Sequence, residues 1–219
     1  RLVVYKSRGA KEVCVRHALT AALFFLLISA NAFSANVRII EGVVVESGLE
    51  FALRDGKTLL LDVYSPEKSE GPLPAVLCLH GGGVISGQRV TARRFALPLA
   101  KHGFVAVAVE YRSARFPAPI HDAKEAVRWM RANAGRINID PDRIGVCGEA
   151  LGGYVAQFLG LTCGVKQYEG EGGCLEHCSR VACVASFSAP SDLIAWYRGS
   201  PDSREWLSEF IGGEPKQAA

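Results

Sequence analysis

The alternation of apolar and polar segments along the chain predicts strands and helices that follow one another in turn. Short continuous apolar runs, typical of buried strands, occupy residues 74–79, 104–110, 144–147 and 181–187. Apolar residues at helical spacing occupy residues 91–102, 122–134 and 150–162. Near-continuous apolar strands that alternate with helices favour a mostly parallel sheet with helices on both faces.

Two further strands are predicted before this alternation begins. Residues 39–46 and 58–64 have strand-like patterns, and Asp55-Gly56 supplies a turn signal between them. Later in the chain, Asp140-Pro141-Asp142 predicts a turn, and residues 163–180 form an excursion that contains glycines and cysteines.

The helix at 122–134 has the most regular pattern. Four apolar residues recur at helical spacing in it, namely Ala123, Ala126, Val127 and Met130. Asp122 and Glu125 resemble a capping box at its start. In the preceding helix, Gly103 stands where a helix is expected to end.

Residues 1–32 have the pattern of a secretory signal peptide. A basic stretch precedes an uncharged apolar run at 18–30, and Ala30-Asn31-Ala32 supplies a cleavage site of small residues. Because a membrane-spanning helix needs about 20 apolar residues, an uncleaved anchor is the less favoured alternative. We therefore expect an exported protein with no stable membrane span after cleavage, and a folded domain over residues 33–219.

Charge excludes an electrostatic surface for nucleic acid. The chain has 25 basic and 22 acidic residues, of which five basic and one acidic residue lie in 1–32, so 20 basic and 21 acidic residues remain. A nearly neutral domain lacks the basic face that phosphate backbones require. A hydrophobic fraction of 49% also excludes a disordered chain.

Six cysteines follow the leader, and they fall into two groups. Three lie in apolar runs and are expected to pack as small hydrophobic residues, namely Cys78, Cys147 and Cys183. Three flank the excursion, where export makes a disulfide plausible without fixing its pairing, namely Cys163, Cys174 and Cys178. Zinc binding through Cys174, His177 and Cys178 is disfavoured, because structural zinc takes four ligands. No metal site and no cofactor are predicted.

Two glycine-rich segments follow predicted strands. Leu79-His80-Gly81-Gly82-Gly83 follows the first, and consecutive glycines allow the backbone to approach a ligand closely. Gly148-Glu149-Ala150-Leu151-Gly152-Gly153 follows the strand at 144–147 and precedes a helix. Gly148 and Gly152 permit a tight strand-to-helix turn, and the N-terminus of the helix favours developing negative charge.

With these motifs in register, residues 38–212 resemble an α/β-hydrolase of the esterase/lipase group that carries an HGGG oxyanion motif. The branch most similar to it contains bacterial feruloyl and acetyl-xylan esterases. Further matching segments are Leu61-Asp62-Val63-Tyr64, Glu110-Tyr111-Arg112, Phe116-Pro117-Ala118, the helix from Asp122 to Trp129 and Asp140-Pro141-Asp142-Arg143-Ile144-Gly145.

The resemblance implies an α/β-hydrolase fold and a serine carboxylic ester hydrolase. Its substrate would be a small-molecule ester or an acylated carbohydrate. By the family pattern, the backbone N–H groups of Gly82, Gly83 and Leu151 would form the oxyanion hole. His80 and Gly81 support the first loop, and Gly148 and Gly152 support the elbow, with His80 packing and hydrogen-bonding beneath the loop rather than acting in catalysis.

The sequence departs from the family pattern at the nucleophile. The central position of the G-x-S-x-G elbow is Ala150, and a methyl group cannot attack a carbonyl. Loss of the nucleophile can cost about 10⁶ in kcat. The chain is therefore expected to be inactive as written.

The acid and histidine of the triad are also missing from their expected order. The last histidine is His177, and none follows Asp192 or Asp202. Asp192 is interpreted as a turn or N-cap residue and His177 as a loop residue. We expect a hydrolase domain that is incomplete at its C-terminus, with an exposed sheet edge and apolar face. The alternative is a catalytically dead hydrolase that binds an ester or carbohydrate ligand.

Four other residues have structural interpretations. His102 and His121 flank helices and are expected at the surface or as capping residues. Trp129 is expected in the core, and Tyr154 either in the core or in the wall of a pocket.

Overall fold

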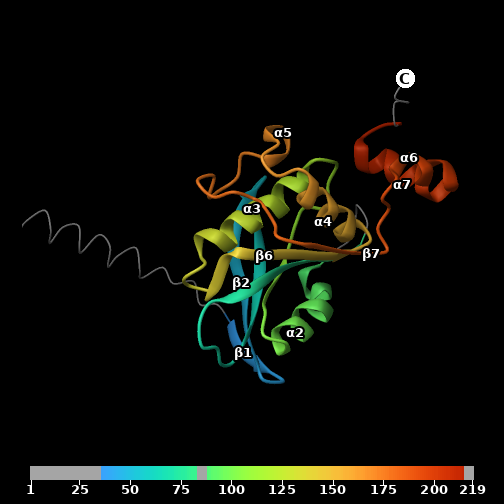
Figure 1. Cartoon of the computed structure of the whole chain (residues 1–219). Helices are drawn as coiled ribbons and strands as arrows, with labels where there is room; N and C mark the ends of the chain where they lie inside the picture. Colours follow the sequence, from blue (N-terminus) through green and yellow to red (C-terminus); the bar gives the residue numbers. More distant parts are fainter. Residues whose placement is uncertain (1–35, 83–87, 215–219) are drawn as a thin grey trace, which may run out of the picture. The chain divides into compact units, whose positions relative to one another are not determined.

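A computed structural model describes residues 36–82 and 88–214, which build one sheet with helices on both faces (Figure 1). The signal peptide expected at 1–32 lies outside the described residues, as does Gly83. No helix within the described residues is long and apolar enough to cross a membrane.

The sheet has seven strands in the order β1-β2-β3-β5-β4-β6-β7. Their bounds are β1 Asn36–Ile40, β2 Val43–Arg54, β3 Lys57–Pro66, β4 Leu73–Leu79, β5 Val105–Val109, β6 Ile139–Glu149 and β7 Val184–Phe187. Strands β4 to β7 pair in parallel, whereas β1, β2 and β3 form an antiparallel extension that joins β5. The predicted α/β-hydrolase fold is thus confirmed, with its parallel part carrying the glycine-rich segments.

The helices follow the strands as the sequence predicts. They are the 3₁₀-helix η1 at Arg89–Ala92, α2 Arg93–Lys101, α3 Ala118–Ala132, α4 Leu151–Leu161, α5 Lys166–Glu169, α6 Leu193–Gly199 and α7 Pro201–Ile211. Helix α2 ends before Gly103, whose φ of +86° is a conformation that glycine adopts without strain. The predicted end of this helix is therefore confirmed.

Two apolar layers hold the helices to the sheet. On one face, Ala96 and Ala100 of α2 pack against small strand residues such as Ala106 and Ala108. On the other face, α3 and α4 cover a larger cluster of branched side chains that includes Leu77. Small residues on the α2 face allow that helix to lie close to the sheet.

The capping box predicted at Asp122 and Glu125 is wrong. Helix α3 begins four residues earlier at Ala118, and its N-cap position is occupied by Pro117. Asp122 is fully buried and accepts hydrogen bonds from the Arg112 guanidinium at 2.9 Å. Asp122 and Glu125 therefore form buried ion pairs with arginines and do not cap the helix.

The predicted turn at Asp140-Pro141-Asp142 falls inside β6 as an irregularity. The pairing of β6 with β4 shifts from Leu73↔Ile139 to Ala75↔Ile144, so the intervening residues have no partners on β4. The Asp142 N–H donates to the Asp140 carboxylate at 3.0 Å, which makes a local turn within the strand.

The cysteines form no disulfide within the described residues. All six cysteines of the described residues are free, so the disulfide that export makes plausible among Cys163, Cys174 and Cys178 is not formed.

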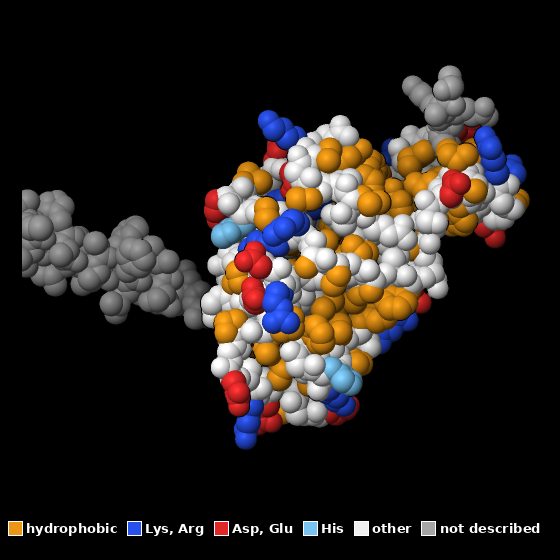
Figure 2. Space-filling view, viewed as in Figure 1, with side chains coloured by type: hydrophobic (Ala, Val, Ile, Leu, Met, Phe, Trp, Pro, Cys, Tyr) orange, Lys and Arg blue, Asp and Glu red, His pale blue; other side chains and the backbone are white. Residues whose placement is uncertain are grey.

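Strand β7 exposes 39% of Val184 and 48% of Phe187. Beside it, between β7 and α2, lies an apolar groove of about 440 Å³, and Figure 2 shows hydrophobic side chains gathered there. Exposed apolar residues and an apolar groove therefore lie along β7 on the described part of the chain.

Candidate active site

A sharp strand-to-helix turn at Ala150 joins β6 to α4. Ala150 has φ +51° and ψ −118°, a conformation that costs free energy for any residue with a side chain. The Ala150 N–H donates to Phe187 O at 3.0 Å, and Tyr154 N–H donates to Ala150 O at 3.0 Å, so both neighbours hold the turn in place. Such a turn projects its side chain outward at the carboxyl end of the sheet.

Two glycines make this turn possible. A Cβ atom at Gly148 would lie 2.3 Å from Gly152 O, and a Cβ atom at Gly152 would lie 2.4 Å from His80 O. Neither distance is tolerable for a carbon atom. Only hydrogen fits at these positions, and the absence of side chains lets the elbow pack directly on the backbone at the end of β4.

The first glycine-rich segment lies against the elbow. A Cβ atom at Gly81 would be 3.5 Å from the Ala150 Cβ and 3.1 Å from Glu149 O. Gly82 follows with φ +129°, a conformation open to glycine. The structure therefore brings Gly81 beside Ala150, with Gly82 next along the loop, whereas Gly83 is not described.

His80 is buried under this loop. Its ring stacks on Tyr111 with 4.2 Å between centroids, and its Nδ1 lies 2.9 Å from Gly81 O. The Tyr111 hydroxyl donates to the His80 carbonyl. Burial lowers the pKa of His80, so the ring stays neutral and Nδ1 donates to the carbonyl. These contacts fix the start of the glycine loop.

A pocket of about 600 Å³ opens at Ala150. Its wall is formed by Ala150, Leu151, Ser188, Pro190, Trp196, Ser200, Asp202, Ser203 and Trp206. Trp196 and Trp206 pack edge to face with 5.0 Å between ring centroids. The pocket therefore combines an aromatic wall with hydroxyls and one carboxylate, and none of the described residues in its wall is a histidine.

The chain's other acid and base candidates lie apart from one another. Asp192 caps α6 and accepts from Ala195 N–H at 2.9 Å, which confirms its interpretation as an N-cap. His177 lies in the excursion with 37% of its side chain exposed, beside Glu176 at 3.6 Å. Asp202 is in the first turn of α7 and reaches the pocket wall. The structure brings Asp202, but no histidine of the described residues, to the pocket.

The remaining candidates have structural roles. His102 lies at the end of α2 with its ring 2.8 Å from Pro98 O, as predicted. The prediction that His121 flanks a helix is wrong, because α3 begins at Ala118; His121 lies within α3 and contacts Gln167 O at 3.3 Å. Trp129 belongs to the core cluster, as predicted. Tyr154 packs between aromatic rings, and burial raises the pKa of its hydroxyl to about 12.

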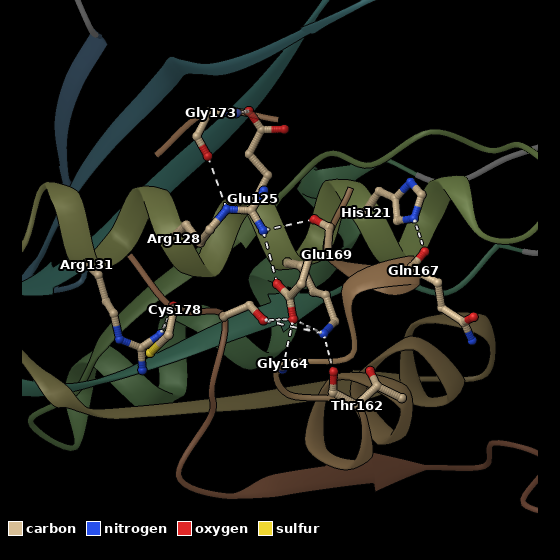
Figure 3. A network of polar contacts seen from close by, with 12 residues as sticks. His121, Glu125, Arg128, Arg131, Thr162, Gly164, Gln167, Glu169, Gly173 and Cys178 are labelled. Atoms are coloured by element: carbon tan, nitrogen blue, oxygen red, sulfur yellow. Dashed lines mark hydrogen bonds and ion pairs between the residues drawn. The ribbon is translucent and has the colours of Figure 1, made fainter. Parts of the chain in front are cut away.

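A buried polar network lies beneath residues 163–180, and no local sequence pattern predicts it. Lys124 is fully buried on α3 and donates to Thr162 O at 2.6 Å and to Glu169 at 2.7 Å (Figure 3). Arg128, one turn further along, donates to Gly173 O at 3.1 Å and to Glu169 O at 3.0 Å. Basic residues on one helix face thus hold residues 163–180 in place.

Glu169 is the acidic centre of this network. Burial acts to raise the pKa of Glu169, but the hydrogen bonds from Lys124 and Ser179 lower that pKa overall. The carboxylate therefore stays charged at neutral pH. Its stabilising contribution is lost only as the pH falls through the lowered pKa of the folded state.

We expect Lys124→Met to release the excursion. The substitution removes the buried ammonium and leaves Glu169 with weaker partners, at a cost of about 2 kcal/mol in the free energy of unfolding. Urea unfolding measures that loss, and limited proteolysis should cut within residues 163–180. Lys166→Met on the exposed surface is the control, and equal effects of the two substitutions would contradict the role of the network.

A second pocket, of about 550 Å³, lies beside this network. It is lined by Arg54, Arg112, His121, Lys166, Gln167, Gly170 and Glu171. Arg54 and Arg112 both pair with the buried Asp122, at 3.4 and 2.9 Å. Because both arginines are matched by acidic partners, this pocket is polar without a strong excess of charge from them.

Comparisons with known proteins agree with the fold. The chain matches the BD-FAE family over residues 61–219. An ethyl acetate hydrolase of Pseudomonas putida is 34% identical over 72% of this chain and 51% of its own length. Esterase LipC of Mycobacterium tuberculosis is 34% identical over 53% of this chain and 30% of its own length.

Solved structures of esterases also share the fold of this chain. A truncated carbohydrate esterase from gut microbiota superposes with a TM-score of 0.66 at 27% identity, covering 74% of this chain and 63% of that one. A thermophilic esterase of Thermogutta terrifontis with propionate bound has a TM-score of 0.63 at 26% identity, covering 84% and 65%.

The chain belongs to the BD-FAE family of α/β-hydrolase esterases. It spans 51% of the length of the ethyl acetate hydrolase and 30% of the length of esterase LipC.

Proposed function

We propose that this chain carries the oxyanion-binding half of a carboxylic ester hydrolase site and binds a small ester or an acylated carbohydrate there. The observation that carries the proposal is the strained conformation of Ala150, with φ +51°, directly beside Gly81 and at the head of a 600 Å³ pocket. Strain of this kind persists where a site requires a side chain to be presented in one direction.

The chemistry proposed for the pocket is binding of an acyl oxygen by backbone N–H groups. Gly82 and Gly83 would supply donors from the first loop, and Leu151 would supply one from the N-terminus of α4. The positive end of the α4 dipole adds to this stabilisation. These donors belong to the backbone, so they do not depend on the residue at position 150.

Hydrolysis itself requires a nucleophile that Ala150 cannot supply. We therefore propose that the chain as written does not turn over esters. The second candidate function is a catalytically dead hydrolase that binds its ligand in the same pocket. The aromatic wall of Trp196 and Trp206 favours ligand binding under both candidate functions, the incomplete hydrolase site and the catalytically dead hydrolase.

The names of the relatives support the substrate class. One relative is an ethyl acetate hydrolase, and one structural neighbour is a carbohydrate esterase. The basic and apolar pattern of residues 1–32 adds export to the proposal.

Intrinsic fluorescence tests the proposed binding. Two of the three tryptophans line the pocket, so phenyl acetate should change their emission saturably, with a Kd of about 1 mM. Chromatography should show that the ester stays intact.

Matched variants locate the signal. The fluorescence change should persist in Trp129→Phe, because Trp129 is in the core, and should fall strongly in Trp196→Phe. A change that disappears in Trp129→Phe and survives in Trp196→Phe would place the ligand elsewhere and refute the proposed pocket.

A further inference from the structure

Two buried thiols lie side by side beneath the candidate site. Cys78 on β4 and Cys147 on β6 are direct partners in the parallel pairing of these strands, and 3.7 Å separates their sulfur atoms. Cys78 is fully buried and Cys147 is 5% exposed. The pair is not used by any step proposed for the ester site.

The position of the pair ties it to both glycine-rich segments. One residue beyond it, Leu79 pairs with Gly148, and the strands then lead directly into His80 and Glu149. If the two sulfurs move closer together, the ends of β4 and β6 move with them. The starts of the two loops that meet at Ala150 are then displaced as well.

Only one of the two sulfurs can be reached from outside. Cys147 lines the apolar groove between β7 and α2, whereas Cys78 is not part of that groove. The hydrogen bond between the two sulfurs lowers the pKa of Cys147, and the same interaction together with burial raises the pKa of Cys78. Cys147 is thus the thiol that ionises first and meets reagents first.

We propose that Cys78 and Cys147 form an oxidisable dithiol that closes to a disulfide by exchange with a small-molecule disulfide such as oxidised glutathione. The Cys147 thiolate attacks the reagent, forms a mixed disulfide and releases one small thiol. Cys78 then attacks the Cys147 sulfur, expels the second small thiol and completes the intramolecular bond. Two protein thiols are oxidised, one small disulfide is reduced, and the two protons leave on the two small thiols.

Closure changes the base of the site and the stability of the fold. The sulfurs must approach from 3.7 Å to about 2.05 Å, which draws the ends of β4 and β6 together. The new bond also links residues 69 positions apart, which restricts the unfolded chain. We expect the midpoint of thermal unfolding to rise by about 5 °C or more.

Other cysteines offer competing reactions that the experiment must separate. Cys183 lines the same groove, with its sulfur 2.7 Å from where a Cβ atom of Gly145 would lie. Cys163 and Cys178 are exposed in the excursion. All three can form an adduct with glutathione, but none of them is paired with Cys78 in the sheet.

The test treats the whole chain with oxidised glutathione, blocks free thiols and maps disulfides by mass spectrometry without reduction. The expected main internal product links the peptides of Cys78 and Cys147 and is two hydrogen atoms lighter than the free pair. The higher midpoint of thermal unfolding should return to its original value on reduction. A Cys147 that stops at the glutathione adduct, or that pairs with Cys183, overturns the proposal.

Controls show that the fold directs the bond. In Cys183→Ser the link should form as before, and in Cys78→Ser the Cys147–glutathione adduct should accumulate. The same treatment in guanidinium should give no preferred pair. If the unfolded chain forms the Cys78–Cys147 bond as selectively as the folded chain, the strand pairing is not its cause and the proposal fails.

Discussion

The chain is expected to hydrolyse p-nitrophenyl acetate no faster than buffer, about 10⁶-fold below an esterase with a complete triad. The reason is the methyl group of Ala150 at the point where the family's elbow presents a hydroxyl. Restoring that hydroxyl by Ala150→Ser should give little turnover, because triad members act as a unit and no histidine of the described residues lines the pocket.

The expected gain from Ala150→Ser is selective reactivity. In the presence of imidazole as an external base, a fluorophosphonate should modify Ser at position 150 at least about tenfold faster than the other pocket serines. Ser188, Ser200 and Ser203 are the internal controls, because they line the same pocket but are not part of the elbow turn. Mass spectrometry reads the site of the adduct. Equal labelling of all four positions would show that the turn does not activate its residue.

Gly152→Ala is expected to lower the free energy of unfolding by about 3 kcal/mol or more, because the new Cβ would lie 2.4 Å from His80 O and 2.6 Å from Leu79 O. These atoms are backbone and cannot turn aside as a flexible side chain does. For a chain of this size the midpoint of thermal unfolding should fall by about 10 °C. Ester binding should weaken too, since the elbow and the glycine loop are forced apart.

Gly199→Ala is the matched control for this prediction. Gly199 ends α6, and a Cβ there would meet nothing within 4 Å, so the same substitution should leave stability unchanged or slightly higher. Calorimetry measures both variants. If Gly152→Ala melts with the wild type, the elbow does not pack on the end of β4 as closely as described here.

Local patterns in the sequence predict the parallel strands and the alternation of strands with helices. Continuous apolar runs predicted β4 to β6, because buried parallel strands need apolar residues on both faces. The start of α3 was missed, because Asp122 is typical of a helix start until its partner is known. That partner, Arg112, lies ten residues earlier and binds Asp122 through tertiary structure.

The candidate site was predictable only where it depends on the backbone. Glycine spacing located the turn at Ala150 and the loop at Gly81, because both need close approach of main chains. The aromatic wall from Trp196 and Trp206 and the Lys124–Glu169 pair join segments distant in sequence. No local pattern records such a contact, so these features required the structure.

The most direct test of the account is an amide NMR titration of the chain with phenyl acetate, which Ala150 leaves unhydrolysed. The account predicts that the backbone N–H signals of Gly82 and Leu151 shift together and saturate at one ligand concentration. If these two signals stay still while others shift, for example those around Arg112 in the polar pocket, the two glycine-rich segments do not form a shared oxygen-binding site.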